Sequence, residues 1–107
     1  MNFITSNKDY KSIFIDNKKN EGNFFIFLYQ KNSANNVLEV GIITGKKVGN
    51  AVIRNKVKRR IKSFIRENKD SLPSNLKMVI IAKQNSGNAT WLEFKEELTR
   101  LFSLINY

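Results

Sequence analysis

Apolar positions along the chain follow two different periods, which together predict an α+β fold. Short apolar runs bounded by turn residues are typical of β-strands, and three such runs occur. They occupy residues 22–31, 37–44 and 76–83. Apolar residues at three- and four-residue steps predict amphipathic helices. This second pattern occupies residues 5–18, 50–68 and 89–105. The predicted order is αββαβα, with one layer of helices against one sheet.

The connections between these segments add two expectations. The polar segment "NSANN" at residues 32–36 predicts a turn, so we expect the first two strands to form an antiparallel hairpin. Pro73 prevents the central helix from continuing beyond the loop that contains it. A chain of 107 residues that is 41% hydrophobic can bury one modest core, so we expect residues 1–107 to form a single domain.

The helix predicted at residues 50–68 has two faces of different character. An apolar stripe contains Ile53, Val57, Ile61, Phe64 and Ile65. A second stripe contains Asn55, Arg59, Lys62 and Arg66, with Arg54 and Lys58 beside it. Residues three and four positions apart share a face of a helix, so one side should pack in the core while the other presents cations.

Charge is concentrated in and just before this helix. Residues 46–66 carry nine of the chain's 19 Lys and Arg residues and no Asp or Glu, and the net charge of the chain is +10. Exposed helices usually mix acidic and basic residues, because like charges repel one another. A bound polyanion would relieve that repulsion, so the pattern indicates nucleic acid or another polyphosphate as the partner.

The composition limits the chemistry that the protein could perform. The chain contains no Cys and no His, so it lacks a thiolate nucleophile and the most common general base and metal ligand. Among the nine carboxylates, Asp9, Asp16 and Glu39 are scattered, and we expect Glu93, Glu96 and Glu97 on the exposed face of the last helix. We therefore predict no catalytic residue and no metal site in the protein.

No apolar run is long enough to span a bilayer, and the N-terminus lacks the pattern of a signal peptide, so we expect a cytoplasmic protein with no membrane partner.

The segment "KVGNAVIRNKVKRRIK", residues 47–62, carries a family resemblance. Its residues Gly49, Ala51, Arg54, Asn55, Lys58, Arg59, Ile61 and Lys62 have the spacing of the signature of the bacterial ribonuclease P protein subunit. The similarity continues on both sides of this segment, in "VGIITGKK" and in "MVIIAK". The chain thus resembles this family over nearly its whole length.

The resemblance implies both a fold and a division of labour. The family's sheet is mixed and contains a left-handed β-α-β crossover (a ribosomal-protein-S5-domain-2-like fold), whereas about 98% of such crossovers are right-handed. Ribonuclease P removes the 5′ leader of precursor tRNA, and its RNA subunit carries the active site and requires Mg²⁺. The protein subunit binds no cofactor itself. The implied partners are the catalytic RNA and precursor tRNA, with no DNA expected.

Two sets of site residues follow from the charge pattern and the resemblance together. The expected RNA-binding residues are Lys46, Lys47, Arg54, Asn55, Lys56, Lys58, Arg59, Arg60, Lys62 and Arg66. The expected cleft for the tRNA leader contains Tyr10, Phe14, Ile26, Leu28 and Lys47.

Two other functions remain open from the sequence. The same basic helix would serve a generic ribosomal-type RNA-binding protein. A stand-alone nuclease is a third possibility, but the missing His and Cys and the scattered carboxylates weigh against it.

Overall fold

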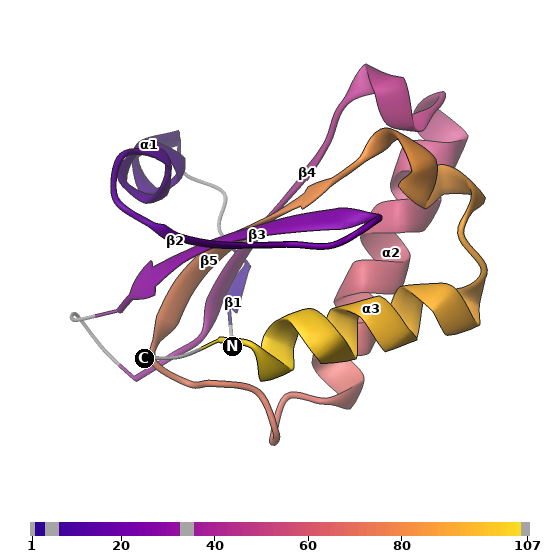
Figure 1. Cartoon of the computed structure of the whole chain (residues 1–107). Helices are drawn as coiled ribbons and strands as arrows, with labels where there is room; N and C mark the ends of the chain where they lie inside the picture. Colours follow the sequence, from indigo (N-terminus) through magenta and orange to yellow (C-terminus); the bar gives the residue numbers. More distant parts are fainter. Residues whose placement is uncertain (1, 4–6, 33–35, 106–107) are drawn as a thin grey trace.

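The computed structural model describes residues 2–3, 7–32 and 36–105, which form one α+β domain (Figure 1). In chain order, its elements are β1 (Asn2–Phe3), α1 (Asn7–Ile15), β2 (Lys18–Glu21), β3 (Phe25–Lys31), β4 (Glu39–Thr44), the 3-10 turn η1 (Lys46–Val48), α2 (Ala51–Glu67), β5 (Leu76–Ala82), the 3-10 turn η2 (Gln84–Asn88) and α3 (Trp91–Ser103). All the helices and strands predicted from the sequence are present. The edge strands β1 and β2 were not predicted.

The five strands form one mixed sheet in the order β1-β4-β5-β3-β2. The central strand β5 is parallel to β4 and antiparallel to β3. The predicted hairpin between residues 22–31 and 37–44 is therefore wrong, because β5 lies between these two strands. The hairpin that does form joins β2 to β3. Most of the predicted turn, residues 33–35, lies outside the described part of the chain.

The crossover from β4 through α2 to β5 explains this strand order. It returns the chain parallel to β4, and it places the most apolar strand at the centre of the sheet. Met78, Val79 and Ile80 of β5 are all fully buried, which requires cover on both faces of the strand. Consecutive strand residues point to opposite faces, so burial of three in a row is typical of a central strand. The left-handed sense of this crossover stays a prediction from the resemblance.

Helices cover both faces of the sheet, so the domain has three layers rather than the predicted two. Helices α2 and α3 pack on one face, and α1 packs on the other (Figure 1). The larger core lies under α2 and α3 and includes Phe27, Ile61 and Leu98. A smaller core under α1 contains Ile13, Leu28 and Val79. The two layers of helices follow from strands that are apolar on both faces.

No helix in the described residues is both long and apolar enough to cross a membrane.

Glu97 of α3 points into the domain, which corrects the prediction that it is exposed. Its side chain is 6% exposed. Its carboxylate oxygens accept hydrogen bonds from the backbone N–H groups of Asn23 (2.6 Å), Phe24 (2.7 Å) and Phe25 (3.0 Å). A Cβ at Gly22 would lie 2.5 Å from Cδ of Glu97, so a larger residue at that position would displace the carboxylate. The carboxylate therefore fixes the turn between β2 and β3 onto α3.

Candidate nucleic-acid interface

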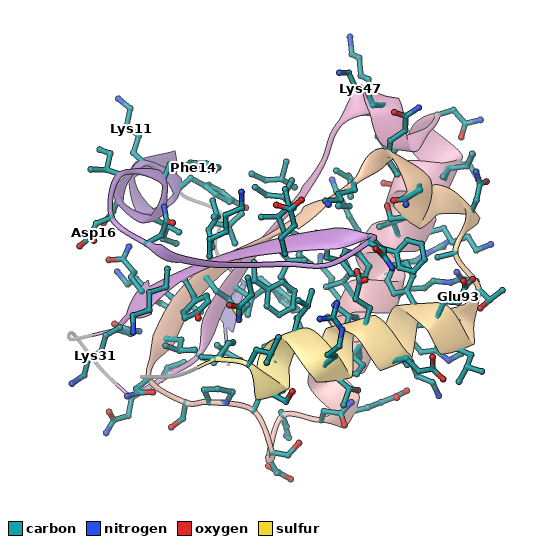
Figure 2. The ribbon with its side chains drawn as sticks, viewed as in Figure 1. Lys11, Phe14, Asp16, Lys31, Lys47 and Glu93 are labelled. Carbon is teal, nitrogen blue, oxygen red and sulfur yellow. The ribbon has the colours of Figure 1, made fainter. Side chains whose placement is uncertain are left out.

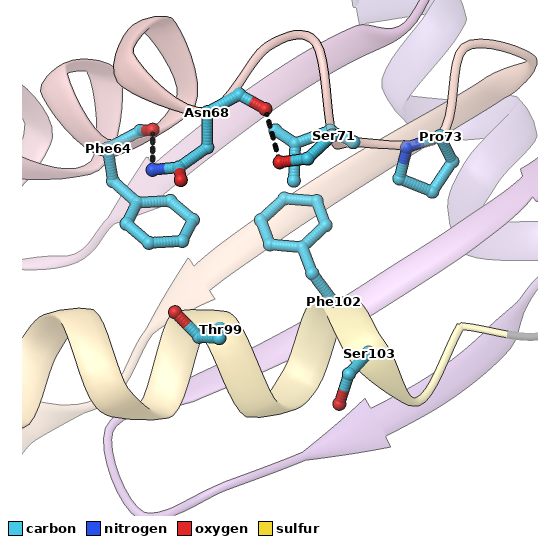
Figure 3. Close-up of a pocket in the computed structure, with 8 residues that line it drawn as sticks. Phe64, Asn68, Ser71, Pro73, Thr99, Phe102 and Ser103 are labelled. Atoms are coloured by element: carbon cyan, nitrogen blue, oxygen red, sulfur yellow. Dashed lines mark hydrogen bonds between the residues drawn. The ribbon is translucent and has the colours of Figure 1, made fainter.

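Helix α2 is anchored at both ends and along its inner side. At its start, the side chain of Asn50 accepts a hydrogen bond from the N–H of Ile53 (3.0 Å). At its end, the side-chain amide of Asn68 donates to the carbonyl oxygen of Phe64 (2.9 Å; Figure 3). The inner side buries Val57, Ile61, Phe64 and Ile65, as the sequence pattern predicted. This anchoring fixes which side chains of α2 face outward.

The outward side of α2 is a continuous cationic surface, which we call the basic face. It consists of Arg54, Asn55, Lys58, Arg59, Lys62 and Arg66. Asn55, Arg59 and Arg66 are exposed, and the other three are half-buried. Within the described residues, no carboxylate forms an ion pair with a cation of α2, since the ion pairs found there involve Lys19, Lys77, Lys83 and Arg100. The charge of the basic face is therefore uncompensated.

Individual cations of α2 differ in what holds them. Lys62 and Arg66 lie over the ring of Phe3 in β1, with their charged groups 5.1 and 5.6 Å from its centroid. Nε of Arg54 is buried and has no hydrogen-bond partner among the described residues. Arg60 donates to the backbone oxygen of Ala89 (3.0 Å), so it faces α3 rather than the basic face. Of the expected RNA-binding residues, Arg60 thus has a structural contact that the sequence did not reveal.

Lys46 and Lys47 lie in η1, directly before α2, and both are exposed. Figure 2 shows Lys47 projecting away from the domain beyond the end of β4. Two glycines shape this turn, one through its backbone conformation and one through close packing. Gly49 has φ of 151°, a conformation that other residues rarely adopt. A Cβ at Gly87 of η2 would lie 2.7 Å from the backbone oxygen of Val48. Tight packing of η1 on η2 therefore positions the two lysines beside the start of α2.

Most residues expected in the leader cleft lie on the face of the sheet that carries α1 or on α1 itself. The strand register places Ile26, Ile81 and Ile43 opposite one another across β3, β5 and β4. All three side chains are half-buried, and we call them the isoleucine row. Of these three residues, only Ile26 was among the expected cleft residues, although the two-residue period of their strands also places Ile43 and Ile81 on this face.

Two aromatic residues of α1 flank this row. Tyr10 is half-buried, and its ring lies so close to Gly41 of β4 that a Cβ there would be 2.5 Å from Cε1. Phe14 is 47% exposed, whereas Lys11 and Asp16 point away from the sheet (Figure 2). Leu28 differs from the other expected cleft residues. It is only 9% exposed and packs with Ile13 and Val79 beneath α1, so the prediction that it lines an open cleft is wrong.

A separate hollow of about 430 Å³ lies between the end of α2, the following loop and α3 (Figure 3). Phe64 and Phe102 form its apolar wall, and Asn68 and Ser71 are hydrogen-bonded to backbone within it. None of the residues that line it is charged. This hollow therefore offers no positive charge to a polyanion. Among the described residues, there is also no group of three or more carboxylates placed to hold a metal ion.

The fold and the basic face define a small α+β protein of the nucleic-acid-binding class. Comparison with known proteins identifies the family. The ribonuclease P family model matches residues 1–106, and the chain belongs to this family. It is 35% identical to the ribonuclease P protein component of Bacillus cereus (strain 03BB102), over 92% of this chain and 86% of that protein. It is 32% identical to the protein component of Bacillus anthracis (strain A0248), over 92% of this chain and 83% of the relative.

Solved structures of the same family have the same fold. The RNase P protein of Staphylococcus aureus superimposes with a TM-score of 0.89 at 26% identity, covering 95% of this chain and 93% of that one. The RNase P protein of Thermotoga maritima gives a TM-score of 0.86 at 27% identity, covering 94% of each chain. The chain is thus a ribonuclease P protein component, which implies a partner RNA and a role in tRNA processing.

Proposed function

We propose that this protein binds the catalytic RNA of ribonuclease P through the basic face of α2, and the 5′ leader of precursor tRNA through the isoleucine row and α1. The observation that carries the proposal is the uncompensated charge of α2, which is held outward by a fully packed inner side. A cationic helix without carboxylate partners favours a polyanion, and the family supplies the identity of that polyanion.

The residues of the basic face suit contacts to RNA phosphates. Arg54, Arg59 and Arg66 can each bind two phosphate oxygens through a planar guanidinium, while Lys58 and Lys62 act as point charges. Lys46 and Lys47 in η1 would extend the same surface past the start of the helix.

The isoleucine row suits a single-stranded leader of varied sequence. Apolar side chains and the rings of Tyr10 and Phe14 contact the faces of bases without reading their hydrogen-bonding edges. Base stacking on aromatic rings contributes about 1–3 kcal/mol per base and tolerates sequence change. Lys47, at the η1 end of this face, would supply a cation for the leader backbone.

The cleavage chemistry is assigned to the RNA subunit and its Mg²⁺. The protein has no His or Cys, so its contribution would be positional and electrostatic rather than acid–base. A cationic face between two RNA molecules lowers their mutual repulsion, and dissolved cations at high concentration do the same. The benefit of the protein should therefore shrink as Mg²⁺ is raised.

Reconstitution with precursor tRNA tests this proposal. We expect leader removal at low Mg²⁺ only when a ribonuclease P RNA and the protein are both present, and a declining protein requirement as Mg²⁺ rises. Cleavage by protein alone would instead support a stand-alone nuclease. An mRNA substrate belongs in the same assay, because one S. aureus relative is described as a mutant with defective mRNA degradation activity. No effect of the protein on any of these reactions would support a generic RNA-binding protein.

Variants of α1 test the leader assignment separately. Replacing Phe14 with Ala should weaken binding of precursor tRNA to the reconstituted enzyme while leaving mature tRNA affinity unchanged, because only the precursor has a leader. Phe14 is 47% exposed, so its loss should leave the fold intact. Tyr10→Ala should act in the same direction, with a melting curve to detect loss of its packing on Gly41. Equal losses for both RNAs would remove these residues from the leader site.

A further inference from the structure

The side of α2 that faces α3 carries a second group of cations, which shares Arg59 with the basic face. A hollow of about 330 Å³ opens here, which we call the Trp91 pocket, and it is lined by Lys56, Arg59, Arg60, Ser63 and Trp91. Lys95 of α3 reaches the same indole ring, with Nζ 5.4 Å from the ring centroid. Cζ of Arg60 lies 5.9 Å from that centroid. Cations from two helices therefore meet around one aromatic side chain.

Two of these cations are held in position before any ligand binds. Arg60 donates a hydrogen bond to the Ala89 backbone oxygen (3.0 Å), and its Cζ is 5.6 Å from the ring centroid of the buried Phe94. Lys95 and Trp91 are half-buried. Side chains that are already ordered lose less conformational entropy on binding a ligand than free ones do. Arg60 and Lys95 are therefore positioned beside the ring of Trp91 before a ligand binds, whereas Lys56 and Arg59 are exposed.

No carboxylate balances this charge inside the pocket. None of the residues described as lining it is acidic. The nearby carboxylates of α3, Glu93 and Glu96, line a different hollow with Asn23 and Arg100. Glu67 is exposed on α2, one turn beyond Ser63. A concave surface lined by charge of one sign raises the local concentration of ions of the opposite sign.

We propose that the Trp91 pocket is a second RNA-contact site, which receives a backbone phosphate of the same RNA that binds the basic face. This inference rests on the proposed function and extends the RNA footprint from α2 onto α3. Arg59 belongs to both surfaces, so one RNA strand can pass from the basic face into the pocket. A phosphate suits the pocket better than a stacked base, because Arg60 and Lys95 already lie near the ring of Trp91.

Lys95 gives the sharpest test, since it lies outside every RNA contact expected from the sequence. We expect Lys95→Gln to weaken binding of a ribonuclease P RNA roughly tenfold and to lower the salt dependence of binding by about one unit. Lys95→Arg keeps the charge and should restore most of the affinity. Lys69→Gln is the matched control, because it removes the same charge from an exposed lysine beyond the end of α2.

Trp91 provides a direct readout of the pocket, because it is the single tryptophan of the chain. Titration with the RNA, and separately with pyrophosphate, should change its fluorescence in the wild type, and Lys95→Gln should need more of either to give the same change. If wild-type protein binds the RNA but Lys95→Gln binds equally well, or if Lys69→Gln loses as much as Lys95→Gln, the pocket is not a specific contact. Failure of the wild type to bind the RNA at all would overturn the proposed function instead.

Discussion

The carboxylate of Glu97 joins parts of the chain that are far apart in sequence. It accepts hydrogen bonds from three consecutive N–H groups in the turn before β3, and it does so from the inner side of α3. Because the carboxylate is buried, these hydrogen bonds replace contacts with water. The three hydrogen bonds to the Glu97 carboxylate therefore hold the β2–β3 hairpin against α3.

Replacing Glu97 with Gln should lower the free energy of unfolding by about 1–3 kcal/mol, because one carboxylate oxygen becomes an NH₂ group that faces N–H donors. Urea or thermal unfolding measures the change. Glu96→Gln is the control, since it removes the same charge from an exposed neighbour and should change stability by less than about 0.5 kcal/mol. Equal effects of the two variants would mean that net charge, rather than the buried hydrogen bonds, determines the loss.

Helical periodicity alone could not have found this role. The amphipathic pattern predicted over residues 89–105 does have its apolar side in the core, where Phe94, Leu98 and Leu101 are buried. Glu97 lies at the edge of that stripe, where a carboxylate is normally solvated. Its burial depends on the backbone of a turn more than seventy positions away in the sequence, and local pattern holds no information about that turn. The same reason explains why the contact of Arg60 with Ala89 was missed.

Among the elements, α2 was predictable and the strand pairing was not. An amphipathic helix is specified by its own sequence, through the apolar stripe, the Asn50 cap and the stop before Pro73. Pairing depends on which strands meet in space, so the turn-like segment after β3 misleadingly suggested a hairpin with β4. Strand β2 ("KKNE") has no apolar residue, because it pairs at an edge of the sheet with its side chains largely exposed.

The basic face of α2 should act through individual phosphate contacts rather than through diffuse charge. Replacing Arg59 with Ala should weaken binding to the catalytic RNA and lower the salt slope by roughly one unit. Replacing Arg100 with Ala should have little effect on binding, because Arg100 lies on the far side of α3 beside Glu96 and Glu97. Filter binding over a range of salt concentrations measures both values. Similar losses for the two variants would contradict the assigned surface.

The domain as a whole carries a charge of +10, much of it on α2 and η1. Self-repulsion of this kind destabilises the compact state, and a folded-state ligand that neutralises it is stabilising. The Trp91 pocket and the basic face both include cations of α2, so anions bound at either surface relieve the same repulsion.

Sulfate or phosphate should therefore raise the melting temperature of the free protein, by roughly 4–8 °C for each kcal/mol of stabilisation. Differential scanning fluorimetry at fixed ionic strength, with chloride as the reference anion, separates anion binding from general screening. A melting temperature that does not respond to the change of anion would show that the folded protein has no specific anion sites.

The central position of β5 also has a consequence for synthesis on the ribosome. β3 and β4 emerge early, and each can pair with its edge partner, β2 or β1. The strand that joins these two pairs is β5, residues Leu76–Ala82, and until it has left the exit tunnel the sheet is divided and α2 has no complete core to pack against. Pairing between distant segments is slow, and unpaired apolar strands are prone to association. A nascent chain stalled before β5 should thus hold its cationic helix without a fixed orientation, so we expect RNA recognition only after β5 has emerged.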